Sequence, residues 1–409
     1  MVVFLAAALV SVVFLAVLPS YWKRSPSVDY PIYYAPVARN LLQGKGFRTA
    51  EGGPAVAYPP GYPLILAGVF AVARGTGLSE MGALKSFNVI ALATASTLLY
   101  AVAKMLFGIR TARLVALAWI SYPLPLWLTK QPNTELAFLV VFFGIVFLVF
   151  QILLREDSRA WLAFCAGALV GAASLIRPAA LALSVPVVLA LFCESRRWST
   201  KQRWRTCAFL FLGNLLAIAP WEIWASRQVS EIIPLCTNGS TAIRDGLSLD
   251  ITPGEVDRVV RVPEDVRALI REFIERESEM KSPGTIARFL GKAFVDRPGS
   301  VIKLFVLKAV RSWYATDSQR FEPYVAMIQA PYLLLAGAGA FVAWRRGGVS
   351  RDYVAFTVLV LFYFWGMTIV VLSIARYMIP AMGLFMILCG FGLSRPWIES
   401  ASPSVSRRS

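Results

Sequence analysis

Histidine is absent from this chain of 409 residues, and charged residues are scarce. Without imidazole, a general base or a metal ligand must come from a carboxylate or from a perturbed lysine, cysteine or tyrosine. Only 16% of the residues are charged and 57% are hydrophobic. Soluble domains carry about a quarter charged residues. The composition therefore excludes an ordinary soluble domain.

The few cysteines do not form a disulfide framework. Cys165, Cys193, Cys207 and Cys389 lie in or at the ends of apolar runs, and Cys236 alone lies in a polar region. No extracytoplasmic disulfide pair is therefore expected.

Long apolar runs, in contrast, recur along almost the whole chain. A run of about 18 apolar residues can cross the hydrocarbon core of a bilayer, which is roughly 30 Å thick. The pattern predicts an all-α polytopic membrane protein with about ten transmembrane helices. The expected spans are Val2–Leu18, Met81–Leu106, Ala112–Leu128, Glu135–Leu154, Trp161–Ile176, Ala179–Cys193, Cys207–Ala225, Val325–Trp344, Tyr353–Leu372 and Tyr377–Leu393.

The net charge of +17 helps to orient these spans. In a soluble protein it would indicate nucleic acid, but lysine and arginine collect in the cytoplasmic loops of membrane proteins. If the N-terminus lies inside, the only lysine and arginine residues in the short outer loops between spans are Lys130, Arg177 and Arg376. We therefore expect a bacterial cytoplasmic (inner) membrane protein with both termini cytoplasmic, and no nucleic-acid partner.

Two longer regions then lie outside the membrane. The expected division is an N-terminal transmembrane core over 1–225 with a first outer loop over 19–80, an extracytoplasmic helical region over 226–324, C-terminal transmembrane helices over 325–394, and a disordered cytoplasmic tail over 395–409.

The region 226–324 has the character of soluble helices. Its apolar residues recur at helical spacing at Val266, Leu269, Ile270, Phe273 and Ile274. Ser282 followed by Pro283 indicates an N-cap with proline in the first turn of the next helix. Two or three short helices over the membrane surface are expected.

The first outer loop carries a carboxylate directly after the first apolar run. Asp29 precedes Pro31 and an amphipathic stretch that is expected to form a short interfacial helix ending at Gly44. Asp29 has a purely structural explanation as a helix N-cap. It is also a candidate catalytic base at the outer surface.

Several patterns occur in an order that resembles a known family. After Asp29 come "YYAPVARNLLQGKGF", "YPPGYPLILA", "TELAFLVVFF", "LIRPAAL", "PWEIWASRQVSEIIPLCTNGS" and "ARYMIPAMGLFMIL". Together they extend over most of the chain. The sequence resembles the integral-membrane glycosyltransferases of the GT-C superfamily. The nearest branch is glycosyltransferase family 39-like, which holds protein O-mannosyltransferases and lipid A aminoarabinose transferases.

The resemblance implies a polyprenyl-phosphate-sugar donor, whose anomeric carbon is attacked by an acceptor hydroxyl with inversion. It places the catalytic Asp of the family on Asp29. The acceptor could be a lipid, a glycan or a protein, and membrane lipids are further partners. Many members have an acidic pair where this chain has Asp29 and Tyr30. Since hard cations need several oxygen ligands, no metal or other cofactor is expected, with a divalent ion left open.

Glu135, at the outer end of the expected fourth span, is a second candidate acid. It could orient the acceptor or hold Lys130. Its structural alternative is an acid in the first turn of a helix, where the helix dipole favours negative charge.

Cations must stabilise the leaving phosphate, and isolated outer arginines suit that task. Arg376 is the first candidate, followed by Arg177, Lys85 and Arg39, with snorkelling towards water as the alternative for the two outer-joint arginines. The candidates for a sugar or acceptor pocket are Tyr34, Tyr58 and Tyr377, although interfacial tyrosine is common in membrane proteins.

A transporter or a lipid flippase is the alternative function. The many expected spans and the excess of basic over acidic residues fit this function equally well. Transporters, however, usually place ionisable groups near the bilayer midplane in broken helices. Here the candidate charges gather at the outer ends of the spans, which favours the glycosyltransferase.

Overall fold

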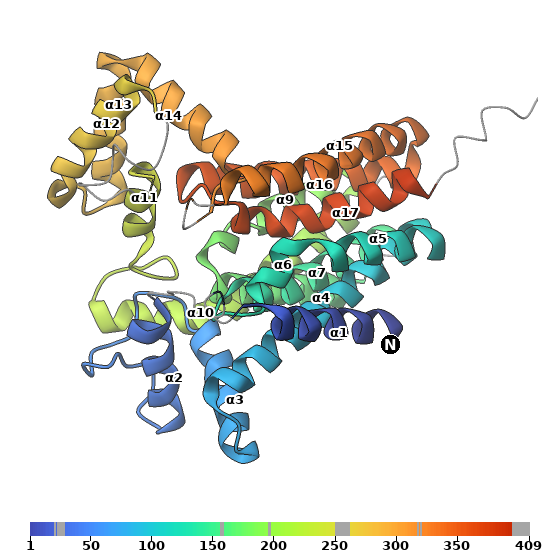
Figure 1. The fold of residues 1–409 in the computed structure, drawn as a ribbon, viewed down its shortest axis with the longest axis horizontal. Coiled ribbons are helices and arrows are strands. Elements are labelled where there is room, and N and C mark those ends of the chain that lie inside the picture. The colour runs from blue at the N-terminus through green and yellow to red at the C-terminus, as the bar shows by residue number, and fades with distance from the viewer. Residues whose placement is uncertain are drawn as a thin grey trace, which may run out of the picture.

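The computed structural model describes residues 1–19, 22, 29–155, 159–194, 198–249, 262–316, 319 and 321–394. Within these residues the fold consists of seventeen α-helices and a few short π and 3₁₀ turns, and no strand is present beyond one bridge between Arg48 and Pro54. Figure 1 shows a bundle of roughly parallel helices with a smaller helical group at one end. The tail over 395–409, expected to be disordered, lies outside the described residues.

Six helical segments in the described residues are long and apolar enough to cross a membrane. They are α4 (Glu80–Phe107), α7 (Glu135–Leu153), α10 (Thr200–Val229), α15 (Glu322–Arg346), α16 (Gly348–Val370), and Ala375–Leu393, which joins η5 (Ala375–Met378) to α17 (Ile379–Leu393). Shorter apolar helices accompany them, namely α1 (Val2–Val17), α3 (Gly61–Thr76), α8 (Ala160–Ile176) and the segment Pro178–Cys193. The all-α polytopic membrane fold is confirmed, whereas the expected number of spans stays a prediction.

Two of the expected spans are not single regular helices. The segment Ala112–Leu128 is two helices, α5 (Ile109–Ser121) and α6 (Pro123–Leu128), with Tyr122 in an extended conformation between them. The segment Ala179–Cys193 begins as a 3₁₀ turn, η3 (Pro178–Ala180), and becomes helical only in α9 (Ser184–Glu194). The first break follows from the steric clash that keeps a residue before proline, here Tyr122, out of the helical region. Expecting one continuous helix over Ala112–Leu128 was wrong.

The region after α1, expected to be the first outer loop, lies below the bundle in the view of Figure 1. The π-helix η2 (Tyr30–Tyr34) continues into α2 (Ala35–Leu42), and Gly44 follows with a positive φ of 72°. The expected short helix and its stop are therefore confirmed. The next segment is the regular 16-residue helix α3, which is shorter than the six candidate spans. Helices α2 and α3 pack together around buried tyrosine and alanine side chains.

The second outer region holds α11 (Gly239–Leu247), α12 (Glu264–Glu275), η4 (Glu277–Glu279), α13 (Pro283–Asp296) and α14 (Pro298–Arg311). Ser282 caps α13 with its side chain in a reciprocal pair with Thr285, as the Ser-Pro signal predicted. The apolar stripe of α12 is buried within this region. Figure 1 shows α14 leading from the α12–α13 pair back to the bundle near α15 and α16. The division of the chain into domains stays a prediction.

Candidate active site

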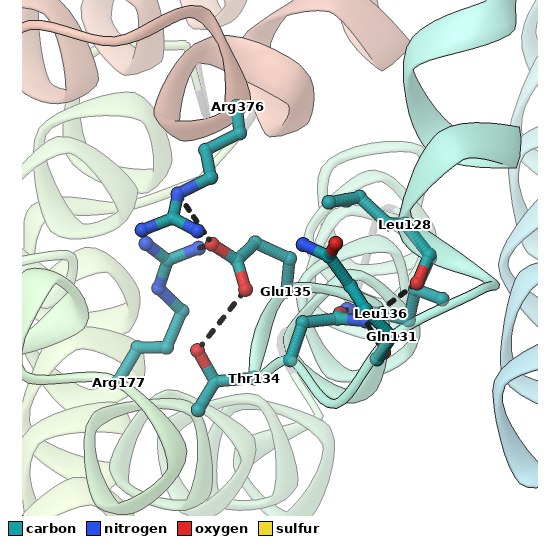
Figure 2. A network of polar contacts seen from close by, with 8 residues as sticks. Leu128, Gln131, Thr134, Glu135, Leu136, Arg177 and Arg376 are labelled. Carbon is teal, nitrogen blue, oxygen red and sulfur yellow. Dashed lines mark hydrogen bonds and ion pairs between the residues drawn. The ribbon is translucent and has the colours of Figure 1, made fainter. Parts of the chain in front are cut away.

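One buried carboxylate holds two arginines together at the end of the bundle. Glu135 is the first residue of α7 and is 5% exposed. Its Oε1 lies 3.4 Å from Nη1 of Arg177 and 3.4 Å from Nε of Arg376. The hydroxyl of Thr134 donates to Oε2 at 3.4 Å. Figure 2 shows the two guanidinium groups side by side, both directed at this carboxylate. One negative charge against two positive charges leaves the cluster net positive.

Each member of this cluster is placed by a helix end. Arg177 ends α8 with an extended backbone because Pro178 follows it. Arg376 lies in η5, the short turn that precedes α17. Asn133 accepts a hydrogen bond from the backbone N–H of Leu136 and so caps α7. From this first turn the Glu135 carboxylate faces both arginines.

Aromatic rings complete the surroundings of the arginines. The guanidinium carbon of Arg177 lies 4.6 Å from the ring centroid of Tyr377 and 5.8 Å from that of Phe138. The guanidinium carbon of Arg376 lies 5.4 Å from the same Tyr377 ring. Contacts of this kind stabilise a cation in a site with little water. Arg177 is only 8% exposed, so its side chain does not snorkel into water.

Lys130, which the sequence offered as a partner for Glu135, makes other contacts. Its Nζ donates to the carbonyl oxygen of Trp22 at 2.8 Å and lies 3.7 Å from the ring centroid of Trp127. Burial lowers the pKa of Lys130 to about 8. This lysine anchors the segment after α1 to the end of α6 and has no ion pair with Glu135 among the contacts that the structure describes.

Asp29 lies at the start of η2 but does not cap it with its side chain. Instead, its Oδ1 accepts a hydrogen bond from the hydroxyl of Tyr58 at 2.9 Å. The backbone of Tyr58 is held in turn by the hydroxyl of Tyr33, which bonds both its carbonyl oxygen and its N–H at 3.3 Å. Asp29 is exposed. Its carboxylate is thus oriented by a fixed partner while it stays open to solvent.

Packed tyrosines connect the two carboxylates. The ring centroid of Tyr34 lies 5.1 Å from that of Tyr58 and 5.0 Å from that of Tyr62. Burial raises the pKa of Tyr34 well above its usual value, and the charges of Asp29 and Glu135 raise it further. Both acids are therefore within electrostatic reach of one ring. Burial likewise raises the pKa of Tyr58, with a further contribution from Asp29.

A close helix contact brings the first outer region onto the arginine cluster. A Cβ atom on Gly61, at the start of α3, would lie 2.6 Å from the carbonyl oxygen of Leu175 near the end of α8. Glycine is needed at this position because any side chain would collide with that backbone. The contact joins the turn that carries Tyr58 to the helix that carries Arg177.

Two other candidates lie apart from this cluster. Arg39 pairs with Glu80 through two hydrogen bonds of 3.3 and 2.7 Å in an exposed position. Lys85 is half-buried on α4. Neither side chain has a hydrogen bond or ion pair with Asp29 or Glu135 in the described part of the chain.

Reasoning from the sequence missed two contributors. Thr134 bonds the Glu135 carboxylate, and Tyr62 packs against Tyr34. The spacing of Tyr58 and Tyr62 in "YPPGYP" was the available signal for the second of these. No group of three or more acidic or cysteine side chains that could hold a metal ion occurs among the described residues, and the expectation that no metal is needed stays a prediction.

Comparison with known proteins gives one family and a shared fold. Residues 57–224 match the family described as dolichyl-phosphate-mannose-protein mannosyltransferase. The matched range includes Tyr58, Glu135 and Arg177 but neither Asp29 nor Arg376. No curated protein sequence matches the chain.

Solved structures with a similar fold include oligosaccharyltransferases of an archaeon. An oligosaccharyltransferase from Archaeoglobus fulgidus, crystallised with Zn and sulfate, superposes with a TM-score of 0.58 and 12% identity over 96% of this chain and 48% of its own. AglB from the same organism, in complex with an inhibitory peptide and a dolichol-phosphate, superposes with a TM-score of 0.57 and 13% identity. The match covers 95% of this chain and 49% of the AglB chain. ArnT from Cupriavidus metallidurans, bound to undecaprenyl phosphate, superposes with a TM-score of 0.46 and 16% identity. The match covers 96% of this chain and 77% of the ArnT chain.

The present chain spans about half the length of the archaeal chains. The shared helical fold covers nearly all of this chain, and the family match falls on the part that holds Glu135 and Arg177. The chain is therefore a polytopic membrane protein that shares its helical fold with the archaeal oligosaccharyltransferase structures.

Proposed function

We propose that this protein is a glycosyltransferase that moves a sugar from a polyprenyl-phosphate-linked donor to an acceptor hydroxyl. The reaction would take place at the outer face of a bacterial cytoplasmic membrane, with both chain termini on the inner side. The observation that carries the proposal is the net positive cluster of Arg177, Arg376 and Glu135 beside the tyrosines that lead to Asp29. The match to a family of dolichyl-phosphate-mannose-dependent enzymes supports it.

The two arginines suit the leaving phosphate. When the glycosidic bond breaks, negative charge grows on the phosphate oxygens, and preorganised cations stabilise that charge. A guanidinium binds phosphate through two parallel N–H donors. Glu135 holds Arg177 and Arg376 close together before the substrate arrives, which reduces their mutual repulsion. Arg39 would have to break its ion pair with Glu80 before contacting a phosphate, and Lys85 lies apart from the cluster. We therefore expect both to contribute less to phosphate binding than Arg177 and Arg376.

Asp29 suits the acceptor. Among the described residues its carboxylate hydrogen-bonds Tyr58, which leaves lone pairs for a substrate hydroxyl. It would accept the hydroxyl proton as the new bond to the anomeric carbon forms, with inversion at that carbon. Tyr58 fixes its orientation, and the rings of Tyr34, Tyr58 and Tyr377 provide apolar faces on which a sugar can stack.

A transporter or flippase is the second candidate, because one observation favours it. The helices are broken at Pro178–Ala180 and before Ala375, and transporters place their substrate sites at such breaks. Uptake of labelled lipid-linked sugar into vesicles separates the two functions. Transport without any covalent sugar product would support this alternative, whereas sugar transfer in detergent, without a membrane barrier, would exclude it as the sole activity.

The Asp29→Asn variant tests the glycosyltransferase directly. The amide keeps the size and the hydrogen bond from Tyr58 but is a poor base, so transfer should fall by about 10² to 10⁴-fold. The assay follows radiolabelled sugar from a polyprenyl-phosphate donor fraction into acceptor in purified membranes. Glu51→Gln, an exposed acid in the same outer region, is the matched control and should transfer normally. Undiminished transfer by Asp29→Asn would remove Asp29 from the mechanism.

A further inference from the structure

Lys308 is a fully buried lysine outside the site described so far. It lies on the inner face of α14, and its exposed fraction is 0%. Its Nζ donates to the carbonyl oxygen of Val371 at 2.9 Å and to that of Gly246. These acceptors belong to the end of α16 and to α11. Burying a lysine is costly unless its N–H groups are satisfied, so this arrangement calls for an explanation beyond packing.

The two carbonyl groups come together because one of them belongs to a glycine. A Cβ atom on Gly246 would lie 1.4 Å from the carbonyl oxygen of Val371. The backbone of α11 therefore touches the end of α16 directly, and Lys308 lies across that contact. A neutral amine has two N–H donors, the number that two carbonyl acceptors require. Burial lowers the pKa of Lys308 to about 7, which makes the neutral form accessible.

The segment that begins at Val371 leads to Arg376. Val371 ends α16, and the chain then turns before it enters η5. The backbone N–H of Ala375 donates to the carbonyl oxygen of Ala315 at 2.9 Å, just beyond the end of α14. The indole N–H of Trp365, on α16, donates to the carbonyl oxygen of Ala309 on α14. The C-terminal end of α14 thus holds both ends of the turn that presents Arg376.

We propose that Lys308 is a positioning residue that fixes the Val371–Ala375 turn, and through it the place of the Arg376 guanidinium opposite Glu135. The proposal rests on the function proposed above for Arg376. It connects the outer helical region to the phosphate side of the site, because α11 and α14 both belong to that region and both pack against α16. Lys308 itself would touch neither donor nor acceptor.

The first test does not depend on activity. Ser373 lies within the turn, is buried, and donates to the carbonyl oxygen of Thr368. In a Ser373→Cys chain, the rate of labelling by a water-soluble maleimide, read by mass spectrometry of that peptide, reports how firmly the turn is held. Adding Lys308→Met should raise that rate by about tenfold or more. Lys303→Met, the same change at an exposed position of the same helix, is the matched control and should leave the rate unchanged.

A second variant separates loss of the hydrogen bonds from general damage to the fold. Lys308→Gln keeps two N–H donors on a shorter side chain, so its labelling rate should lie between those of the Lys308 chain and Lys308→Met. Equal rates in all three chains, or a faster rate in Lys308→Gln than in Lys308→Met, would contradict the proposal. If Lys308→Met cannot be purified in folded form, Lys308→Gln alone still tests the proposal. A labelling rate equal to that of the chain with Lys308 would then overturn it.

The second test uses decaprenyl phosphate as a probe of the phosphate side. Lys308→Met should weaken its binding about tenfold, and combining this change with Arg376→Ala should weaken it no further than Arg376→Ala alone, because one residue acts through the other. Additive losses would show that Lys308 acts elsewhere. Failure of the unaltered chain to bind the probe would count against the proposed function, while the labelling rate of the Ser373→Cys chain would still decide the role of Lys308.

Discussion

The two acids of the proposed site lie in different surroundings. Glu135 is buried, with two arginines and a threonine around its oxygens, whereas Asp29 is exposed and hydrogen-bonds Tyr58. A charged group removed from water needs several compensating partners, while an exposed one does not. The difference separates two tasks. The buried side holds a fixed charge pattern, and the open side admits a substrate group that must be exchanged at each turnover.

The comparison also explains how function and stability divide between the acids. Replacement of Glu135 affects the fold first, because Arg177 stays buried when the carboxylate is gone. Replacement of Asp29 affects chemistry first, because its hydrogen bond lies at an exposed position and water can substitute for it. The predictions below test this division, beginning with the largest expected effect.

Glu135→Gln should destabilise the protein by about 3–5 kcal/mol, the usual cost of removing one partner from a buried ion pair. The amide leaves Arg177 and Arg376 facing each other without a counter-charge. Thermal unfolding in detergent measures the effect. Glu80→Gln is the matched control, since Glu80 forms its pair with Arg39 at the surface, with side chains 33% and 47% exposed. That pair should contribute about 0–1 kcal/mol. Similar losses from both changes would refute the contrast between buried and exposed acids.

Arg177→Lys should weaken binding of decaprenyl phosphate by about tenfold, which corresponds to about 1.4 kcal/mol. Lysine keeps the positive charge but loses the planar fork that binds two oxygens at once and stacks on Tyr377. Binding is measured by titration of the purified chain. Arg48→Lys, an exposed arginine whose guanidinium donates to the carbonyl oxygen of Gly52, is the control and should bind normally. If Arg177→Lys also binds normally, point charge alone explains the affinity.

The sequence indicated the members of the site better than their partners. Arg177 and Arg376 stood out because isolated charges at the ends of apolar runs are rare. That both meet Glu135 could not be inferred, since the three residues lie 42 and 199 positions apart and no periodicity relates them. From the sequence, Glu135 could orient the acceptor, hold Lys130 or interact with its own helix dipole, and its position between two arginines was missed.

The same holds for the backbone. The rule for residues before proline was sufficient to place the break at Tyr122, but hydropathy alone joined α5 and α6 into one span. At Arg177 the expected spans were already separate, and the break there agrees with them. In α3, in contrast, prolines near the start leave the helix intact. Proline is tolerated in the first turn, where the backbone N–H has no partner in the helix. Position within the helix, not the mere presence of proline, decides the outcome.

Tyr58→Phe should produce the smallest effect and bears on the open side of the site. It removes the hydroxyl that donates to Asp29 but keeps the ring that packs on Tyr33 and Tyr34. A single hydrogen bond of this kind contributes about 0.5–1.5 kcal/mol, so transfer should fall by about two- to tenfold. Stability should hardly change, because water can reach the exposed carboxylate and replace the lost donor.

Kinetics with varied acceptor identify the step that Tyr58 supports. If the hydroxyl orients the base, the loss should appear in kcat more than in the KM for the acceptor, since orientation matters most as the proton moves. In an Asp29→Asn background the Tyr58→Phe change should have little further effect, because the base that it orients is already gone. An undiminished loss in that background would show that Tyr58 acts on the sugar directly and that Asp29 is oriented by other means.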